Sequence, residues 1–448
     1  MKDDSNSGPR PVPEEIVLDA CGERPLPDVG IIEQLWRTSP IPKDRIADTA
    51  AAAVGSFDFA DIPEGGDVAV GTGSRGIANI PTIVRSIVHE LHERGYEPFV
   101  FPAMGSHGGA TADGQREMLA SLGVTEEAIG CEIRATMETT VVGETLDRGV
   151  EVHADANAAA ADAIVPINRV KPHTDFQGDV ESGLSKMLVI GMGKQRGAKT
   201  AHEWAMDWSF RNMIPEIASL LVEELPVVGG VAIVEDEHDE TATIEGVPPE
   251  GFLDREAELL EEAYARLPTI PFDEVDVLVV DRMGKDISGS GMDTNVIGRL
   301  VFGPEPAPEK PDIKRIFVRG LTEASHGNAT GLGSADLIHA DLFETINLSD
   351  TFVNGLTASA PRGVRIPPAV ETDRAGLHAC LSTIGVTSPE DARVVRIRDT
   401  MRLDRFVASP ALIAEARERD DLRVVREPEP IDFEGGQFTE DLVSGMLL

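Results

Sequence analysis

Residues 67–107 restrict the fold most strongly, because they read as a strand, a glycine-rich turn, a helix and a second strand. The apolar residues 68–70 predict a strand that enters the turn 71–76, GTGSRG. A helix is expected from Pro81, a residue favoured at first helical positions, to Gly95. The second strand ends in a Gly-Ser-His turn. This order is a βαβ unit, which predicts an α/β protein with mainly parallel sheets.

The length of 448 residues predicts more than one domain, because single cores stop growing at roughly 250–300 residues. Residues 268–271, Pro-Thr-Ile-Pro, read as a linker, and a second strand-then-glycine pattern follows. We expect a disordered arm over residues 1–13, a catalytic and cofactor domain over 14–267, and a C-terminal α/β domain over 268–448. Ligands of open α/β sheets bind beyond the carboxyl ends of strands, so the active site is expected in a cleft between the two domains.

Two expectations concern the N-terminal part of the catalytic domain. Residues 14–20, EEIVLDA, predict a short strand. A helical region is expected near Ile31–Ala53, interrupted by Pro40 and Pro42.

The charge of the chain excludes several classes of partner. A formal net charge of −38 disfavours nucleic acid and anionic membrane surfaces. The acidic residues are spread along the chain, as on the acid-coated surfaces of halophilic proteins.

Cys21, Cys131 and Cys380 are too far apart for a cysteine-based zinc site or a disulfide framework. No signal sequence or apolar run of about 20 residues is visible, so we expect a soluble, cytoplasmic protein.

Two histidines occupy turns after predicted strands. His107 stands between Ser106 and Gly108, and His173 follows Pro172 after the strand near 162–168. An unperturbed imidazole titrates at about 6.5, so it can both take and give a proton at neutral pH. The alternative is that each is a solvated loop histidine.

Lys186 lies in the apolar, glycine-rich run SGLSKMLVIGMG. Burial would depress its pKa and make its amine nucleophilic, although a structural lysine with an exposed amine is the alternative. His202 is expected to open a helix, either as a metal ligand or as a capping or surface residue. No set of further ligands accompanies it at a metal-binding spacing, so a metal there would need donors from another group.

The glycine-rich turn resembles a dinucleotide fingerprint only weakly, because no carboxylate ends the following strand. Its backbone can still bind an anion, and Arg75 could clamp a carboxylate or phosphate or remain an exposed surface arginine. A polar nest from Lys285 to Asn295 follows a strand of the C-terminal domain and would face the cleft.

These motifs together resemble the nickel-dependent lactate racemase family over roughly residues 67–266. The matching features are, in chain order, the turn Ser74-Arg75, Gly105-Ser106-His107, Pro172-His173, Ser182-Gly183-Leu184-Ser185-Lys186 and His202.

The resemblance implies a nickel-pincer nucleotide, a pyridinium mononucleotide whose sulfur groups hold nickel. It casts Lys186 as the covalent tether and His202 as the protein's nickel ligand. It casts His107 and His173 as the acid/base pair that serves the two faces of the substrate carbon. Binding residues inferred alongside are Arg75, Thr72 and Ser74 for the cofactor, and Arg75, Lys285 and Asn295 for the substrate.

The implied function is racemisation or epimerisation of a 2-hydroxy acid by hydride transfer to and from the cofactor. Thr72 replaces a family aspartate, and the segment between His173 and Lys186 is longer and carries Asp179 and Glu181. These departures favour a substrate larger and more polar than lactate, such as a sugar acid. The implied partners are a small 2-hydroxy acid and cofactor-synthesis proteins, for a monomer or homodimer. The alternatives are a sugar-acid dehydratase or dehydrogenase, and a non-catalytic ligand- or cofactor-binding protein.

Overall fold

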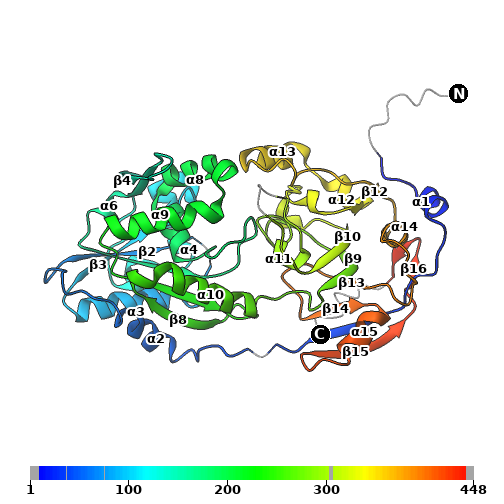
Figure 1. The fold of residues 1–448 in the computed structure, drawn as a ribbon, viewed down its shortest axis with the longest axis horizontal. Helices are drawn as coiled ribbons and strands as arrows, with labels where there is room; N and C mark the ends of the chain where they lie inside the picture. Colours follow the sequence, from blue (N-terminus) through cyan, green and yellow to red (C-terminus); the bar gives the residue numbers. More distant parts are fainter. Residues whose placement is uncertain (1–9, 37, 75, 302–305, 440–448) are drawn as a thin grey trace. The chain divides into compact units, whose positions relative to one another are not determined.

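The computed structural model describes residues 10–36, 38–74, 76–301 and 306–439 (Figure 1). It is a mixed α/β structure with mainly parallel sheets, as the βαβ pattern predicts. Contacts divide the chain into two compact units, Thr38–Leu267 and Pro268–Leu448, the latter joined by the N-terminal residues before Thr38. No helix among the described residues is long and apolar enough to cross a bilayer.

The Thr38–Leu267 unit is built on a five-stranded sheet with the order β3-β2-β6-β7-β8. Four strands are parallel and the edge strand β8 is antiparallel to β7. The strands are β2 (Asp67–Thr72), β3 (Glu97–Pro102), β6 (Ala163–Arg169), β7 (Gly230–Glu235) and β8 (Thr241–Val247), with a separate hairpin of β4 (Thr139–Glu144) and β5 (Glu151–Asp155). The helices are α2 (Ile46–Val54), α3 (Ile80–Glu93), α4 (Ala112–Ser121), α5 (Glu126–Ile129), α6 (Ala156–Ala159), α7 (Leu184–Lys186), the π-helical turn η2 (Met187–Met192), α8 (Lys194–Trp208), α9 (Phe210–Glu224) and α10 (Phe252–Arg266).

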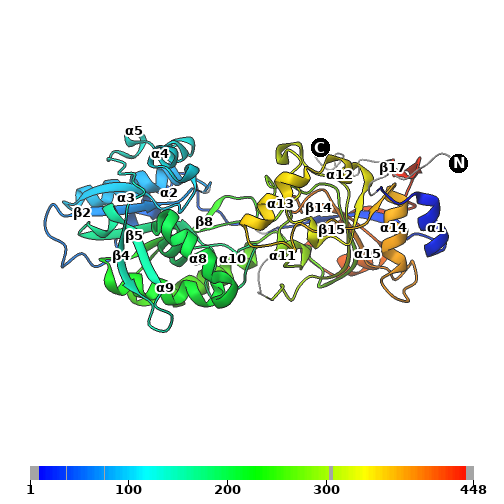
Figure 2. The same cartoon turned by 90° about the horizontal axis from the view of Figure 1, so that it is seen from above.

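Two hydrophobic cores lie on the two faces of this sheet. In β2, Val68 and Val70 pack with helices α2 and α3, whereas Ala69 between them packs with α9 and α10. Side chains of a strand point alternately to opposite faces, so a strand buried on both faces is apolar without interruption. Figure 2 shows α3 and α9 on opposite sides of the sheet. The predicted βαβ unit is therefore β2-α3-β3, with Pro81 in the first turn of α3.

The second unit contains an eight-stranded sheet with the order β12-β11-β10-β9-β13-β14-β1-β15. The first five strands of this order are parallel, and the last three pair antiparallel. The strands are β1 (Val29–Gln34), β9 (Glu274–Val280), β10 (Asp312–Val318), β11 (Leu337–His339), β12 (Ala369–Val370), β13 (Val394–Ile397), β14 (Arg405–Ala408) and β15 (Leu422–Glu429), with a hairpin of β16 (Phe433–Glu434) and β17 (Gln437–Phe438). The helices are α1 (Glu14–Cys21), α11 (Thr294–Ile297), α12 (Ala340–Thr345), α13 (Leu348–Thr357), α14 (Asp373–Ser382) and α15 (Pro410–Ala416).

Contacts group the residues before Thr38 with Pro268–Leu448, whereas residues 14–37 were expected in the catalytic domain. Residues 31–34, expected at the start of a helical region, belong instead to β1 (Val29–Gln34), which pairs with β14 on one side and β15 on the other in the second unit's sheet. Residues 14–20 form helix α1 and not the predicted strand. Its first turn carries Glu14 and Glu15, which favour a helix N-terminus, and Val17 is buried in the core with α14.

Two further expectations concern a helical region near residues 31–53 and a disordered arm over residues 1–13. Only α2, at residues 46–54, realises the helical region expected near 31–53. Of the expected disordered arm, residues 1–9 lie outside the described residues. Val12 pairs with β12, because its N–H donates to Ala369 O over 2.8 Å.

Fragments of the chain should reveal which unit requires β1 in order to fold. We expect residues 38–267 to fold alone, because their sheet is continuous in sequence, and residues 268–448 to remain unfolded, because β14 and β15 lose the strand between them. Far-UV circular dichroism and solubility measure the outcome. Joining residues 10–37 to residue 268 through a flexible linker should restore folding. A folded 268–448 fragment without them would contradict the assignment.

Candidate active site

The carboxyl ends of three neighbouring parallel strands bring the predicted turns to one edge of the sheet. Strands β3, β2 and β6 lie side by side and run in the same direction. The turn with Ser74 follows β2, the turn with His107 follows β3, and His173 lies four residues beyond the end of β6. Ligands of α/β sheets bind at this edge.

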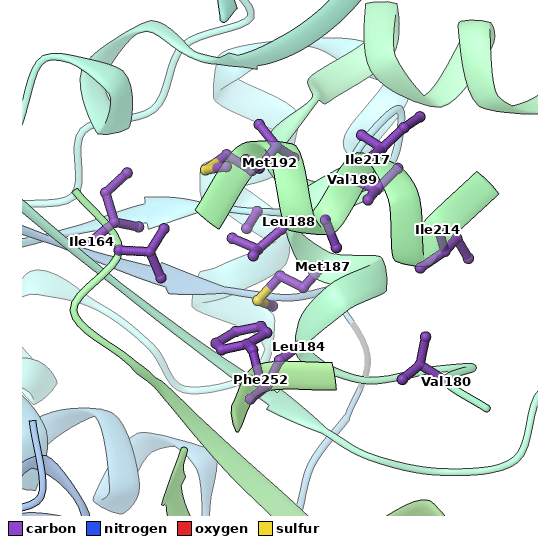
Figure 3. Packing of buried hydrophobic residues seen from close by; sticks show 14 of the residues in the cluster. Ile164, Val180, Leu184, Met187, Leu188, Val189, Met192, Ile214, Ile217 and Phe252 are labelled. Carbon is purple, nitrogen blue, oxygen red and sulfur yellow. The ribbon is translucent and has the colours of Figure 1, made fainter. Parts of the chain in front are cut away.

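The lysine-containing run forms consecutive helical segments and leads into α8. Residues 184–186 form α7, residues 187–192 form the π-helical turn η2, and α8 starts at Lys194. The apolar side chains of α7 and η2 point into the core formed with α9 and α10 (Figure 3). Turns of π-helix are rare and occur often at functional sites.

Glycines allow the His107 turn to lie directly against η2. The N–H of Gly105 donates to the carbonyl of Gly191 over 3.0 Å. A Cβ atom on Gly191 would lie 2.5 Å from the Ala103 oxygen, so no larger residue fits without a shift of the backbone. Gly105 has a φ of 59°, a conformation that glycine adopts without strain.

A buried ion pair joins these same segments. Lys194 and Asp155 have no exposed side-chain surface, and their charged atoms lie 2.9 Å apart. The Lys194 amine also donates to Pro102 O over 2.5 Å and to Gln115 Oε1 over 3.1 Å. Gln115 in turn donates to Gly105 O over 2.8 Å. One ammonium therefore connects the start of α8 with β5, α4 and the end of β3.

The rings of Phe176 and Phe210 contact Lys186 and two of the histidines. The Lys186 amine lies 5.6 Å from the ring centroid of Phe176, and the His173 ring lies 4.7 Å from it. Phe176 packs on Phe210 at 5.4 Å, and His202 meets Phe210 edge-on at 5.3 Å. Lys186, His173 and His202 are thus brought together around one aromatic pair.

His202 lies in the second half of α8 and does not open it, because the helix already begins at Lys194. The residue is exposed, yet partial desolvation lowers its pKa. The positive charge of Lys186 lowers it further, and Asp175 acts in the opposite direction. A neutral imidazole is the form that ligates metals.

The β2 turn is described except for Arg75, which lies outside the described residues. The Ser74 hydroxyl hydrogen-bonds to Nδ1 of His107, which is exposed. Thr72 is only 1% exposed, and its Oγ1 has no hydrogen-bond partner among the described residues. A buried hydroxyl without a partner is destabilising unless a bound group or water completes it.

The sequence linked Glu181 only to a more polar substrate, but its side chain is buried within the His173 loop. It is 1% exposed and accepts the N–H of His173 over 2.5 Å, the N–H of Gly178 over 3.1 Å and the hydroxyl of Tyr264 over 2.9 Å. Burial raises the pKa of Glu181 to about 7, although these donors and the charge of Lys186 lower it.

Glu256 of α10 supports the segment that carries Lys186. Its carboxylate accepts the N–H of Ser185 over 2.9 Å and the Ser185 hydroxyl over 2.5 Å. A Cβ on Gly183 would lie 1.9 Å from Glu256 Oε1, so the carboxyl group fills the space beside this glycine. Burial raises the pKa of Glu256 to about 7. The glycine and serine of the S-G-L-S-K motif thus accommodate a carboxyl group.

The two C-terminal residues expected to bind substrate lie in the second unit. Lys285 is exposed, its amine contacts Asn354 of α13, and desolvation lowers its pKa. Asn295 is 5% exposed in α11, where its side chain donates to Asp293 over 3.2 Å.

The site residues that sequence reasoning missed are Lys194, Asp155, Glu256, Tyr264 and Phe176. Lys194 directly follows the glycine-rich run that contains Lys186. Its similar sequence environment is the one local signal that could have identified it. Among the residues described, no three His, Cys, Asp or Glu side chains are placed to hold a metal ion together.

Comparisons with known proteins match part of the chain to a family model and most of it to a solved structure. A family model described as a domain of unknown function, DUF362, matches residues 71–247. No curated protein matches the chain. Among solved structures, the lactate racemase apoprotein from Thermoanaerobacterium thermosaccharolyticum is similar, with 13% sequence identity and a TM-score of 0.41. The alignment covers 83% of this chain and 88% of that chain.

Replacing Lys194 tests the buried pair. Lys194→Met should lower the free energy of unfolding by about 3–5 kcal/mol, because it leaves Asp155 buried and unpaired. Chemical denaturation measures the change. Lys199→Met is the matched control on the same helix, where Lys199 and Glu203 form an exposed pair, and it should change stability by less than about 1 kcal/mol. Equal effects of the two substitutions would contradict the assignment.

Because the pKa of Glu256 is raised, we expect Glu256→Gln to increase the free energy of unfolding in a pH-dependent way. A raised pKa means that the folded protein holds this proton more tightly than the unfolded chain, so ionisation destabilises the fold as pH rises from about 5 to about 7. The variant should match the wild type at pH 5 and exceed its unfolding free energy at pH 8 by on the order of 1–3 kcal/mol. Glu261→Gln, exposed on the same helix, should show no such trend. A gain confined to low pH would refute the argument.

Proposed function

We propose that this protein is an isomerase that racemises or epimerises a 2-hydroxy acid, using a nickel-pincer nucleotide tethered at Lys186. The observation that carries the proposal is the grouping of Lys186, His173 and His202 around Phe176 and Phe210. These are three of the residues whose motifs resemble the lactate racemase family. His173 follows the carboxyl end of β6, and ligands of α/β proteins bind at the carboxyl ends of strands.

The residues present fit such a cofactor. Lys186 offers an amine for the tether, and Glu256 holds the preceding residue, Ser185, in place. His202 offers an imidazole whose lowered pKa keeps it neutral at neutral pH, which a nickel ligand requires. Thr72 offers a buried hydroxyl that lacks a partner within the described part of the chain. When bound, the group would accept hydride from carbon 2 of the substrate and return it.

The protein's own part in the reaction is proton transfer and orientation. In the proposal, one imidazole, His107 or His173, takes the proton of the substrate hydroxyl, and the other supplies a proton when the opposite configuration forms. Inversion requires a base for each face of the carbon. Arg75 remains our proposed clamp for the substrate carboxylate, since guanidinium binds carboxylate through two parallel hydrogen bonds.

The size of the substrate is a further part of the proposal. The loop after His173 is longer than in the lactate enzymes that the motifs resemble, and it carries the exposed Asp179, whereas Glu181 is buried and bonded within the protein. We therefore propose a 2-hydroxy acid with further hydroxyl groups, such as a sugar acid.

Mass spectrometry and chiral analysis test the function. Protein produced together with cofactor-synthesis proteins should carry nickel and a mass adduct that maps to Lys186, and Lys186→Arg should abolish the adduct. A panel of 2-hydroxy acids analysed by chiral chromatography should reveal one that is racemised or epimerised. His107→Asn and His173→Asn should each lower kcat by at least about 100-fold, the usual contribution of acid/base catalysis.

Two other outcomes would replace the proposal. Release of a keto product would indicate a dehydratase or dehydrogenase, and hydrogen at carbon 2 would then not be retained in heavy water. An unmodified, nickel-free and inactive protein under the same conditions would contradict the proposed function.

A further inference from the structure

The His173 loop is closed at its base by the backbone. Lys171 and Ser182 face each other as an antiparallel bridge, with N–H to O distances of 2.9 and 3.3 Å in the two directions. The intervening residues therefore leave and return to one point beyond the end of β6. Closure at the base alone leaves the shape of the loop's tip undetermined, because the ten residues from Pro172 to Glu181 lie between the two bridged positions.

The tip is shaped by a hydrogen bond to the catalytic imidazole itself. The N–H of Asp175 donates to Nδ1 of His173 over 3.0 Å. A ring nitrogen that accepts a hydrogen bond carries no proton, so the neutral imidazole carries its proton on Nε2. The ring packs on Phe176, which limits its rotation. The conformation of residues 173–176 therefore decides which nitrogen of His173 exchanges protons.

Glu181 holds that conformation from inside the loop. Its Oε2 accepts the N–H of His173, and its Oε1 accepts the N–H of Gly178 and the hydroxyl of Tyr264. The two oxygens thus bind both ends of the loop's tip, and α10 supplies the third donor. A glutamine amide in this place could accept on one side only, because its NH₂ group would face donors on the other.

We infer that Glu181, held by Tyr264, is a positioning residue for His173: it fixes the loop so that Asp175 occupies Nδ1 and His173 exchanges protons through Nε2 alone. The inference deepens the proposed function and rests on it for its catalytic consequence. Its structural part, a single tautomer set by a buried carboxylate, concerns the protein without cofactor.

Nitrogen NMR of the histidine rings tests the structural part. In cofactor-free protein with ¹⁵N-labelled histidine, the His173 signals are those lost in His173→Gln. We expect a single neutral tautomer with a bare Nδ1 and a protonated Nε2. Glu181→Gln should convert these signals to values averaged between two tautomers, and the exposed control Glu261→Gln should leave them unchanged. Wild-type signals in Glu181→Gln would overturn the inference.

Tyr264→Phe provides a second, gentler variant if Glu181→Gln does not fold. It removes one hydroxyl and one of the three donors to Glu181. A detectable share of the second tautomer supports the inference, and an unchanged single tautomer in this variant, with Glu181→Gln unfolded, overturns it.

Kinetics of the cofactor-loaded protein test the catalytic part separately. Glu181→Gln should lower kcat by at least about tenfold with KM little changed, because the substrate is still bound while the proton-exchanging nitrogen is no longer held. A tenfold loss in kcat/KM that comes from a higher KM, with kcat unchanged, would contradict a positioning role. If the protein is not a racemase, the NMR result still decides whether Glu181 sets the tautomer.

Discussion

At the first residue of α8, an ammonium group and a carboxylate with no exposed surface lie 2.9 Å apart. Removing both charges from water is costly, and the attraction between them offsets that cost only when the other hydrogen-bonding positions are filled. The Pro102 carbonyl and the Gln115 side chain fill them on the lysine side, and the N–H groups of Asn157 and Ala158 bind the other oxygen of Asp155. The pair has strict directional needs, so it fixes β3, α4, β5 and α8 in one arrangement. The turn of His107 and the helix of His202 extend from those elements.

A second layer of buried acids supports the lysine and the remaining histidine. Glu256 binds the residue before Lys186, and Glu181 binds the backbone of His173. Helix α10 supplies Glu256 and also Tyr264, the partner of Glu181. Burial raises the pKa of both glutamates to about 7, because the ionised form of each carboxyl group loses its hydration in the folded protein. Such groups persist where the geometry they impose is needed, and here they impose it on the residues of the candidate site.

Much of the fold could be predicted from local patterns, because periodicity and glycine placement are local properties. The apolar residues 68–70, Pro81 and Gly95 indicated β2-α3-β3, and the order of the strands placed Ser74, His107 and His173 at one sheet edge. The N-terminal strand β1 could not be predicted, because its partners β14 and β15 lie more than 370 residues away along the chain and fold over it. Residues 14–20 carry β-branched side chains but become a helix, since packing on α14 outweighs local propensity.

The reactive residues of the candidate site could be proposed from the sequence, whereas the residues that support them could not. Histidines and lysines in glycine-rich turns are visible in a sequence. The supports depend on contacts between distant segments, such as Ser185 with Glu256 and Lys194 with Asp155. Nothing local distinguishes Glu256 from the exposed glutamates of the same helix. The structure distinguishes Glu256, because its carboxyl group occupies the space beside Gly183 where a larger side chain would lie.

Anomalous X-ray diffraction at the nickel edge, on crystals of protein produced with the cofactor-synthesis proteins, tests the central claim most directly. We expect one strong nickel peak within bonding distance of an imidazole nitrogen of His202, joined by continuous density to the Lys186 amine. A nickel peak held by other residues, or an unmodified Lys186 in an otherwise active enzyme, would contradict it.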